Sequence, residues 1–260
     1  MSKTIDMLQI RDVSKIFPSG TTALTSVTAD IAQGEAVILL GHNGSGKSTL
    51  LRSIGRLETV TSGDIFIEGQ SVQRANAKDL RKIRKRMGFV FQKFNLIPTL
   101  SVFQNVLFGA LGQHPFIVST FHPFANSSLR AQAMNCLDRV GLGHLAASRA
   151  DQLSGGQQQR VAIARMLMQD PFIVLADEPI ASLDPKAGIE VMELLVDVAR
   201  EKNITLICTL HQLDLALSYG TRFIGLKQGE LVLDEIKNKQ SVHSFKWLYE
   251  EKKKVVVSHV

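Results

Sequence analysis

Cysteine is scarce in this sequence, with only 2 among 260 residues. Cys136 and Cys208 lie far apart in unrelated contexts, which excludes a disulfide framework and a zinc site built from cysteines. This usage of cysteine favours a reducing cytosol. Long apolar runs are also missing, because stretches such as 36–40 and 172–176 are much shorter than a membrane span, and residues 1–11 lack the basic-then-apolar pattern of a secretory signal. We therefore expect a chain that does not cross a bilayer by itself.

Proline and aromatic residues are few, with 7 prolines and an aromatic fraction of 6%. Hydrophobic residues make up 45% of the chain and charged residues 21%, which are ordinary values for a folded protein. This composition excludes disordered and collagen-like chains. The length suits one large domain, or one domain with a small insert.

Neither sign of charge strongly predominates, because the chain has 30 lysine and arginine residues and 24 aspartate and glutamate residues. The net charge of +6 favours an anionic partner, such as a nucleotide, a nucleic acid or an acidic membrane surface. Five of the cations fall within residues 81–86. A solvated helix face is the simplest interpretation of that run, which is the only feature that favours nucleic acid.

Strand patterns alternate with helical patterns along the chain. Residues 36–40 form a continuous apolar run that suits a strand buried on both faces, and a glycine-rich turn and a helical pattern follow directly. Similar buried strands are predicted at 172–176, 204–209 and 222–226, with a helix over 186–202. This alternation predicts a parallel or mixed α/β core.

The middle of the chain has a different pattern. Residues 101–168 are mostly helical in character, with Ser101, Ser127 and Ser154 as expected N-caps. Within this region, residues 112–126 contain two prolines and no clear period, so we expect an irregular insert there. We interpret the helical region as a subdomain inserted into the α/β core.

A glycine-rich segment between the first buried strand and its helix fits the pattern of a phosphate-binding loop. Glycines let backbone N–H groups close around phosphates, and the start of the following helix adds its positive dipole end. Lys47 supplies a cation for the terminal phosphates, and the Ser48 hydroxyl is a ligand suited to Mg²⁺. The expected nucleotide-binding residues of this loop are Gly41, His42, Asn43, Gly44, Ser45, Gly46, Lys47, Ser48 and Thr49.

Two adjacent acids, Asp177 and Glu178, follow the predicted strand at 172–176. Because ligands gather at the carboxyl ends of parallel strands, we expect Asp177 beside Ser48, where its carboxylate would serve a metal ion. Glu178 can then hold or deprotonate the water that attacks the γ-phosphate. The two side chains would thus divide metal binding and catalysis between them.

A second phosphate-binding helix start is predicted at residues 153–157. Ser154 is expected to cap a helix, and Gly155 and Gly156 leave its first N–H groups open to an anion. One ATP molecule cannot easily use both helix starts of one chain, because they belong to different subdomains. Two chains arranged head to tail can, so ATP would join a dimer.

Together these motifs resemble those of the nucleotide-binding subunits of ABC transporters, and the resemblance covers nearly the whole chain. It implies a P-loop NTPase fold of the α/β class, an ABC ATPase core with an antiparallel β subdomain and an inserted α-helical subdomain. The implied boundaries are residues 8–92 and 170–235 for the ATP-binding core, 93–169 for the helical subdomain with the signature motif, and 236–260 for a C-terminal tail.

Further site residues follow from the same resemblance. Gln92 is similar to the glutamine that touches Mg²⁺ and the membrane partner, and Asp184 to the aspartate of the loop that crosses the dimer seam. His211 is similar to the histidine that holds the γ-phosphate, and Phe17 stands where the family usually has a tyrosine that stacks on adenine. The implied catalytic residues are Glu178, His211, Gln92 and Lys47, the implied metal ligands are Ser48, Gln92 and Asp177, and the implied nucleotide-binding residues of the signature are Ser154, Gly155, Gly156 and Gln157.

The resemblance also implies cofactors and partners. ATP and Mg²⁺ would bind, the ATP-bound state would be a homodimer, and two copies of a transmembrane permease would hold the subunit at the cytoplasmic face of the plasma membrane. A periplasmic or extracytoplasmic substrate-binding protein would take part indirectly, and no nucleic acid is expected as a partner.

A narrower resemblance is to phosphonate-import ATPases. It rests on residues 150–152, 157–160, 175–185, 210–214 and 223–226, and it implies uptake of phosphonate or a related phosphorus oxyanion. The alternatives for the transported solute are phosphite, phosphate or a polar amino acid. A soluble ABC ATPase that acts on nucleic acid is a further alternative, but such chains usually contain long coiled coils or two cassettes, and this sequence has neither.

Overall fold

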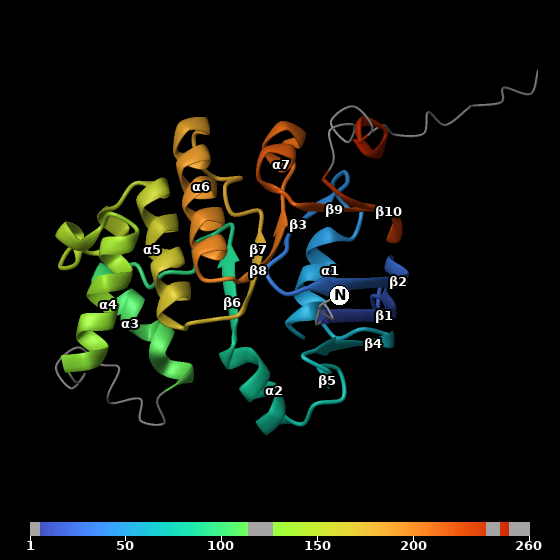
Figure 1. The fold of residues 1–260 in the computed structure, drawn as a ribbon, viewed down its shortest axis with the longest axis horizontal. Coiled ribbons are helices and arrows are strands. Elements are labelled where there is room, and N and C mark those ends of the chain that lie inside the picture. Colours follow the sequence, from blue (N-terminus) through green and yellow to red (C-terminus); the bar gives the residue numbers. More distant parts are fainter. Residues whose placement is uncertain (1–5, 114–126, 238–244, 250–260) are drawn as a thin grey trace, which may run out of the picture.

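The computed structural model describes residues 6–113, 127–237 and 245–249. Most of the predicted insert at 112–126 and much of the predicted tail at 236–260 lie outside the described residues. Figure 1 shows two β-sheets at the centre and right of the view, with helices packed beside them.

The strands and helices follow one another in the alternating order that the sequence predicts. The strands are β1 (Asp6–Ile16), β2 (Thr22–Ala32), β3 (Ala36–Leu40), β4 (Ser62–Ile67), β5 (Gln70–Ser71), β6 (Met87–Phe91), β7 (Ile173–Asp177), β8 (Thr205–Thr209), β9 (Arg222–Lys227) and β10 (Glu230–Ile236). The α-helices are α1 (Lys47–Ile54), α2 (Ala77–Lys85), α3 (Val102–Leu107), α4 (Ser127–Arg139), α5 (Gly155–Met168), α6 (Pro185–Glu201) and α7 (Leu213–Tyr219).

The larger sheet has six strands in the order β10-β9-β3-β8-β7-β6. Its neighbouring strands from β9 to β6 pair in parallel, and β10 pairs antiparallel with β9. Strands β3, β7 and β8 are almost entirely buried, as their continuous apolar runs predict. This arrangement confirms the predicted mixed α/β core.

Alternate residues of β3 point into two different hydrophobic cores. Ile38 and Leu40 belong to a core that contains residues of α3, α4, α5 and α6. Val37 and Leu39 belong to a second core, formed with α1 and the smaller sheet. Because successive side chains of a strand point to opposite faces, one short strand joins both cores directly before the phosphate loop.

The smaller sheet is antiparallel, with the strand order β2-β1-β4-β5. In β2 the buried residues Leu24, Val27, Ala29 and Ile31 are separated by exposed ones, as expected for a strand with one solvent-facing side. The turn between β1 and β2 carries Phe17. This sheet therefore presents Phe17 to the region around α1.

Helices α3, α4 and α5 occur between β6 and β7 in the chain and lie at the left of Figure 1. Ser101 and Ser154 cap α3 and α5 through capping boxes, as predicted. The prediction of Ser127 as an N-cap is wrong, because Ser127 is already the first residue of α4. Serine also occurs in the first helical turn, so residue type alone does not separate the two positions. Within the described ranges, none of the helices is long and apolar enough to cross a membrane.

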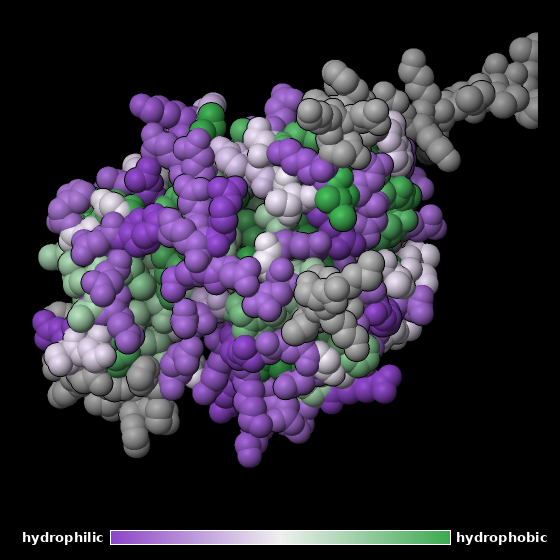
Figure 2. Space-filling model, viewed as in Figure 1, coloured by the Kyte–Doolittle hydropathy of each residue, from purple (hydrophilic) through white to green (hydrophobic). Residues whose placement is uncertain are grey.

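The basic run at 81–86 lies on α2 and directly after it, where Figure 2 shows hydrophilic side chains at the lower edge of the molecule. Arg84 donates hydrogen bonds to the carbonyl groups of residues 55–56. Arg86 forms an ion pair with Glu68. Lys82 pairs with Asp79 within α2. Three of the five cations thus have partners in the structure, which weakens the case for a continuous anion-binding face.

Residues beyond β10 also belong to the core. Phe245 and Leu248 are fully buried, and the Phe245 ring packs against Phe223 with 5.3 Å between the ring centroids. Gly225 makes room for this segment, because a Cβ there would lie 2.9 Å from Leu248. No sequence pattern pointed to this contact, since the two segments share no local period.

Candidate functional site

The carboxyl ends of three parallel strands align in one row. Phe91 pairs with Asp177, and Asp177 pairs with Thr209, so β6, β7 and β8 end side by side. This edge is where open α/β sheets bind their ligands. The predicted site residues Gln92 and Glu178 directly follow β6 and β7, and His211 lies two residues after the end of β8.

Gly41 and Gly46 give the phosphate loop its shape. Their φ angles are 136° and 108°, in a region that side chains disfavour. A Cβ on Gly41 would lie 2.3 Å from the carbonyl oxygen of Leu226, and one on Gly46 would lie 2.5 Å from that of Ala23. Neighbouring backbone therefore packs directly on the loop and fixes it between β3 and α1.

The Lys47 ammonium group is held by the loop itself. Its Nζ donates to the carbonyl oxygens of Gly41 at 2.7 Å and His42 at 2.9 Å. Burial lowers the pKa of Lys47, and the negative charges of Glu178 and Asp177 oppose that shift. The cation is thus positioned between the loop and the two acids, where phosphate oxygens can also reach it.

Ser48 and Asp177 are hydrogen-bonded to each other, with 2.8 Å between Ser48 Oγ and Asp177 Oδ1. Asp177 also lies 3.3 Å from Arg52 Nη2 and 3.3 Å from Thr209 Oγ1. Sequence analysis did not identify Arg52 or Thr209. Their spacing could have done so, because Arg52 lies one turn after Ser48 on α1 and Thr209 ends β8 two residues before His211.

Glu178 is held in a conformation unusual for a residue other than glycine. Its φ is 50°, and a left-handed conformation of this kind costs about 1 kcal/mol. Its N–H donates to Thr209 Oγ1 at 2.8 Å, and its Oε1 lies 2.5 Å from His211 Nε2. Backbone strain tends to occur at functional sites, and here it occurs at the residue that contacts His211.

A cavity of about 270 Å³ lies over the phosphate loop. Its lining includes Phe17, the loop residues 43–49 and Glu178. Lys15 Nζ lies 4.9 Å from the centroid of the Phe17 ring. The cavity combines an aromatic ring that can stack on a base, amides and a cation for phosphates, and a carboxylate, which suits a nucleoside triphosphate.

The side chains present fit Mg²⁺ through oxygen ligands. Ser48 and Asp177 already lie within hydrogen-bonding distance of each other, and Gln92 follows the neighbouring strand end. In the described part of the chain, no group of three or more His, Cys, Asp or Glu side chains could form a closed cage for a metal ion. Mg²⁺ commonly takes one or two protein oxygens and completes its shell with phosphate oxygens and water, so this open set is suitable.

The signature residues do not line this cavity. Ser154 Oγ accepts a hydrogen bond from the Gln157 N–H at 3.4 Å. Gly155 and Gly156 face residues 183–187, because a Cβ on either one would lie 3.0–3.2 Å from side chains there. The start of α5 is therefore packed against the start of α6, away from the phosphate loop of its own chain.

Asp184 and Gln92 also lie outside the lining of the cavity. Asp184 caps α6, where Oδ1 accepts the Ala187 N–H at 3.0 Å. Gln92 is exposed at the end of β6. The structure thus brings Lys47, Ser48, Asp177, Glu178 and His211 into one contact network and leaves the predicted dimer-seam and signature residues separate.

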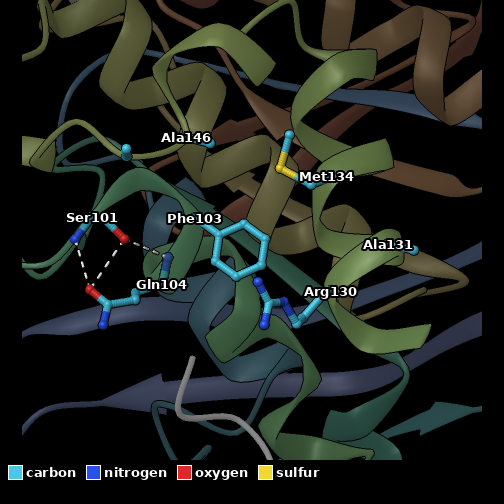
Figure 3. Close-up of a pocket in the computed structure, with 8 residues that line it drawn as sticks. Ser101, Phe103, Gln104, Arg130, Ala131, Met134 and Ala146 are labelled. Carbon is cyan, nitrogen blue, oxygen red and sulfur yellow. Dashed lines mark hydrogen bonds between the residues drawn. The ribbon is translucent and has the colours of Figure 1, made fainter. Parts of the chain in front are cut away.

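Further cavities lie outside the phosphate loop, among them two with distinct linings. One, of about 550 Å³, lies between the start of α3 and α4, where Figure 3 shows Phe103 beside Arg130 and Met134. Its lining contains no strand end and no glycine loop. The other, called the β6–α5 groove below, has a volume of about 470 Å³, and its lining includes Phe89, Phe91, Asn95, Phe108 and Arg165.

The fold and this site define a class of protein. The model of the ABC transporter family matches residues 24–181. The chain belongs to that family and is an ATP-hydrolysing subunit of a transporter.

Curated relatives resemble nearly the whole chain. The sequence is 44% identical over 250 residues to the phosphonates import ATP-binding protein PhnC of Staphylococcus haemolyticus, an alignment that covers 96% of this chain and 97% of that protein. It is 47% identical over 228 residues to the protein of the same name from Lactobacillus johnsonii, covering 88% of this chain and 89% of that protein.

Solved structures confirm the predicted fold. The ATP-binding cassette MJ0796, in a dimeric post-hydrolysis state bound to ADP and Pi, is similar with a TM-score of 0.78 and 37% identity, covering 88% of this chain and 98% of that chain. CbiO1 from Clostridium perfringens, part of the ABC transporter complex cbiONQ, is similar with a TM-score of 0.78 and 32% identity, covering 90% and 89%.

Proposed function

We propose that this chain is the ATPase subunit of an importer for phosphonate or a related phosphorus oxyanion. The assignment of ATPase activity is supported by two contacts beside the phosphate loop, Ser48–Asp177 and Glu178–His211. The choice of phosphonate is supported by relatives that are 44–48% identical and named for phosphonate import. Phosphite, phosphate and a polar amino acid are the alternative solutes, since the permease and binding protein select the solute.

ATP would lie along the 270 Å³ cavity. Adenine would stack on Phe17, the loop amides and Lys47 would bind the phosphates, and Mg²⁺ would be held by Ser48, Asp177 and Gln92. When bound, Mg²⁺ neutralises charge on the phosphate oxygens. The remaining catalysis rests on position and electrostatics, because this site holds no side chain poised as a covalent nucleophile.

Glu178 and His211 would have different roles at the γ-phosphate. In the structure His211 Nε2 lies against Glu178 Oε1. When ATP enters, His211 would transfer this contact to a γ-phosphate oxygen. The Glu178 carboxylate would then accept a hydrogen bond, and subsequently a proton, from the attacking water.

The second half of each site would come from a second copy of this chain. The first N–H groups of α5 have no intrahelical partners and carry its positive dipole end. Gly155 and Gly156 leave these groups accessible, and the long Ser154 Oγ contact at 3.4 Å is easily exchanged for a phosphate oxygen. Asp184, beside this helix start, would lie at the seam. The ATP-bound state would be a homodimer with two shared sites.

Closure of the dimer would be transmitted to a transmembrane permease. Residues 93–169 would move as a helical subdomain relative to the core at 8–92 and 170–235. The β6–α5 groove suits a permease helix, because Phe89 and Phe91 stack there with 5.5 Å between ring centroids and Asn95, from the segment after Gln92, lines it. Two permease copies would then hold two ATPase subunits at the cytoplasmic face of the membrane, with a substrate-binding protein on the far side.

The variant Glu178→Gln tests the ATPase mechanism. Without its carboxylate the chain should bind Mg-ATP, form a stable dimer and release phosphate at least about a hundredfold more slowly than the parent. Light scattering and a phosphate-release assay measure the two properties. Glu190→Gln, which alters only a surface ion pair with Arg160, is the matched control and should behave as the parent. A Glu178→Gln chain that stayed monomeric with ATP would contradict the proposal.

Transport of phosphonate is tested in cells. A strain that lacks this gene should lose growth on methylphosphonate as the sole phosphorus source, and the parental gene should restore growth whereas Glu178→Gln should not. Growth on phosphate or phosphite serves as the comparison. Normal growth of the deletion strain on methylphosphonate alone would favour another solute. Filter binding in a salt series separately tests the alternative of nucleic acid.

A further inference from the structure

Helix α5 holds the backbone on both sides of Gln92. Before Gln92, the carbonyl oxygen of Phe91 lies 3.3 Å from Gln159 Nε2. After Gln92, the carbonyl oxygens of Phe94 and Asn95 accept hydrogen bonds from the Arg165 guanidinium at 2.9 and 2.5 Å. One helix therefore contacts the strand end that leads into Gln92 and the loop that leads away from it.

The loop held by Arg165 has an unusual backbone. Phe94 and Asn95 have φ angles of 53° and 52°, and two successive left-handed residues other than glycine persist only where the surroundings enforce them. The planar guanidinium donates to both carbonyl oxygens at once, which matches its fixed fork of donors. Arg165 is thus the side chain that stabilises this local conformation.

An ion pair does not explain why an arginine occupies position 165. Among the described residues it forms no ion pair with a carboxylate, although it is half-buried and burial lowers its pKa. Its hydrogen-bond partners are the two loop carbonyls, and it lines the β6–α5 groove next to Asn95. A half-buried cation is costly to keep where an apolar side chain would fill the space, so its contacts to the loop are its evident contribution.

Gln159 extends the connection to Glu178. This side chain is fully buried, and its Nε2 lies 2.6 Å from the carbonyl oxygen of Pro179, which directly follows Glu178. The same amide group therefore contacts the ends of β6 and β7. Together, Gln159 and Arg165 tie the helix that begins at Ser154 to both Gln92 and Glu178.

We propose that Arg165 and Gln159 are positioning residues that set Gln92 and Glu178 relative to the start of α5. The proposal rests on the proposed function and deepens it. When the γ-phosphate of ATP on a second chain binds the start of α5, α5 is displaced. Arg165 transmits this displacement to Gln92, and Gln159 transmits it to Glu178. The ATP site and the groove for the permease are then coupled by one rigid helix.

Steady-state ATPase measurements on the full chain test this role. Arg165→Met should lower kcat by about tenfold to a hundredfold, because Gln92 would no longer be held in place. KM for ATP should stay within about twofold, since Arg165 does not line the nucleotide cavity. Arg165→Lys keeps the charge with a single donor group and should recover part of kcat. Arg160→Met, on the same helix, removes only the surface ion pair with Glu190 and is the matched control.

A spectroscopic measurement separates this proposal from the proposed function. A nitroxide at Lys93→Cys, in a Cys136→Ala and Cys208→Ala background, reports the mobility of the segment after Gln92 without ATP. Arg165→Met and Arg165→Lys should each increase that mobility, and Arg160→Met should leave it unchanged. Parental mobility in a folded Arg165→Lys chain, or parental kcat in either Arg165 variant, would overturn the proposal. A parental chain without ATPase activity would instead overturn the proposed function.

Discussion

At the residue scale, Gly41 and Gly44 belong to one loop but have different surroundings. Both have positive φ angles, 136° and 78°, yet a Cβ on Gly41 would lie 2.3 Å from a backbone oxygen whereas one on Gly44 meets nothing within 4 Å. Gly44→Ala should therefore lower the free energy of unfolding by about 1 kcal/mol, the cost of the backbone conformation. Gly41→Ala should lower it by about 3 kcal/mol or more, because the clash with Leu226 is added.

Chemical denaturation of the nucleotide-free chain measures both values. The two variants share the same substitution and the same loop, so their difference reports the steric contact together with the greater backbone cost at a φ of 136°. Equal losses of stability for Gly41→Ala and Gly44→Ala would mean that the packing of Leu226 on the loop contributes little.

Residue-scale features differ in how far the sequence reveals them. Lys47, Ser48 and Asp177 could be identified because their spacing from glycines and strand ends is local. Arg165 and Gln159 could not, because their partners are backbone carbonyl groups many residues away, and any residue type supplies a carbonyl. The groups proposed to contact the nucleotide could thus be predicted from the sequence, whereas those proposed to position them could not.

At the element scale, Asn105 on α3 fixes the loop that precedes its helix. Its side chain is fully buried, accepts the Ile97 N–H at 2.8 Å and donates to the carbonyl oxygens of Ile97 and Ser101 at 3.1 Å. Asn105→Ala should lower the free energy of unfolding by about 2–3 kcal/mol, since these groups would lose their partners. Asn135→Ala, on the exposed face of α4, should change it by less than about 0.5 kcal/mol.

Thermal and chemical unfolding of the two asparagine variants provide the comparison. Similar small effects would show that water replaces the Asn105 contacts and that the loop is held by other means.

The positions of elements with strong periodicity were predicted well from the sequence. The side-chain interactions between elements were predicted less well. The buried strands and the helix at 186–202 lie within one or two residues of β7, β8, β9 and α6, because continuous apolar runs and helical spacing are local signals. The basic run at 81–86 was interpreted as a solvated helix face, but the sequence did not reveal that Arg84 and Arg86 bond to groups outside α2. The burial of Phe245 and Leu248 had no local signal in the sequence.

At the scale of the whole molecule, the site depends on an arrangement that no local pattern encodes. The order β10-β9-β3-β8-β7-β6 aligns strands that are more than eighty residues apart in the chain, such as β6 and β7. Alternation of strands and helices predicted a mixed sheet but not this order. The order places Gln92, Glu178 and His211 at the same edge of the sheet as the end of β3, where the phosphate loop begins.

The separation of Ser154 from its own phosphate loop is also a property of the whole chain. The signature lies at the start of α5 and lines no part of the 270 Å³ cavity. Under the proposed function, a single chain would therefore offer two incomplete halves of an ATP site. Pairing of two chains would complete both.

A crystal structure of the Glu178→Gln chain with Mg-ATP tests this pairing most directly, through the distance from the ATP γ-phosphate to the nearest Ser154. The account predicts two chains head to tail, with Ser154 Oγ of the second chain within hydrogen-bonding distance of that phosphate. A nucleotide bound by Lys47 and Ser48 whose γ-phosphate faces solvent, with every Ser154 far away, would contradict it.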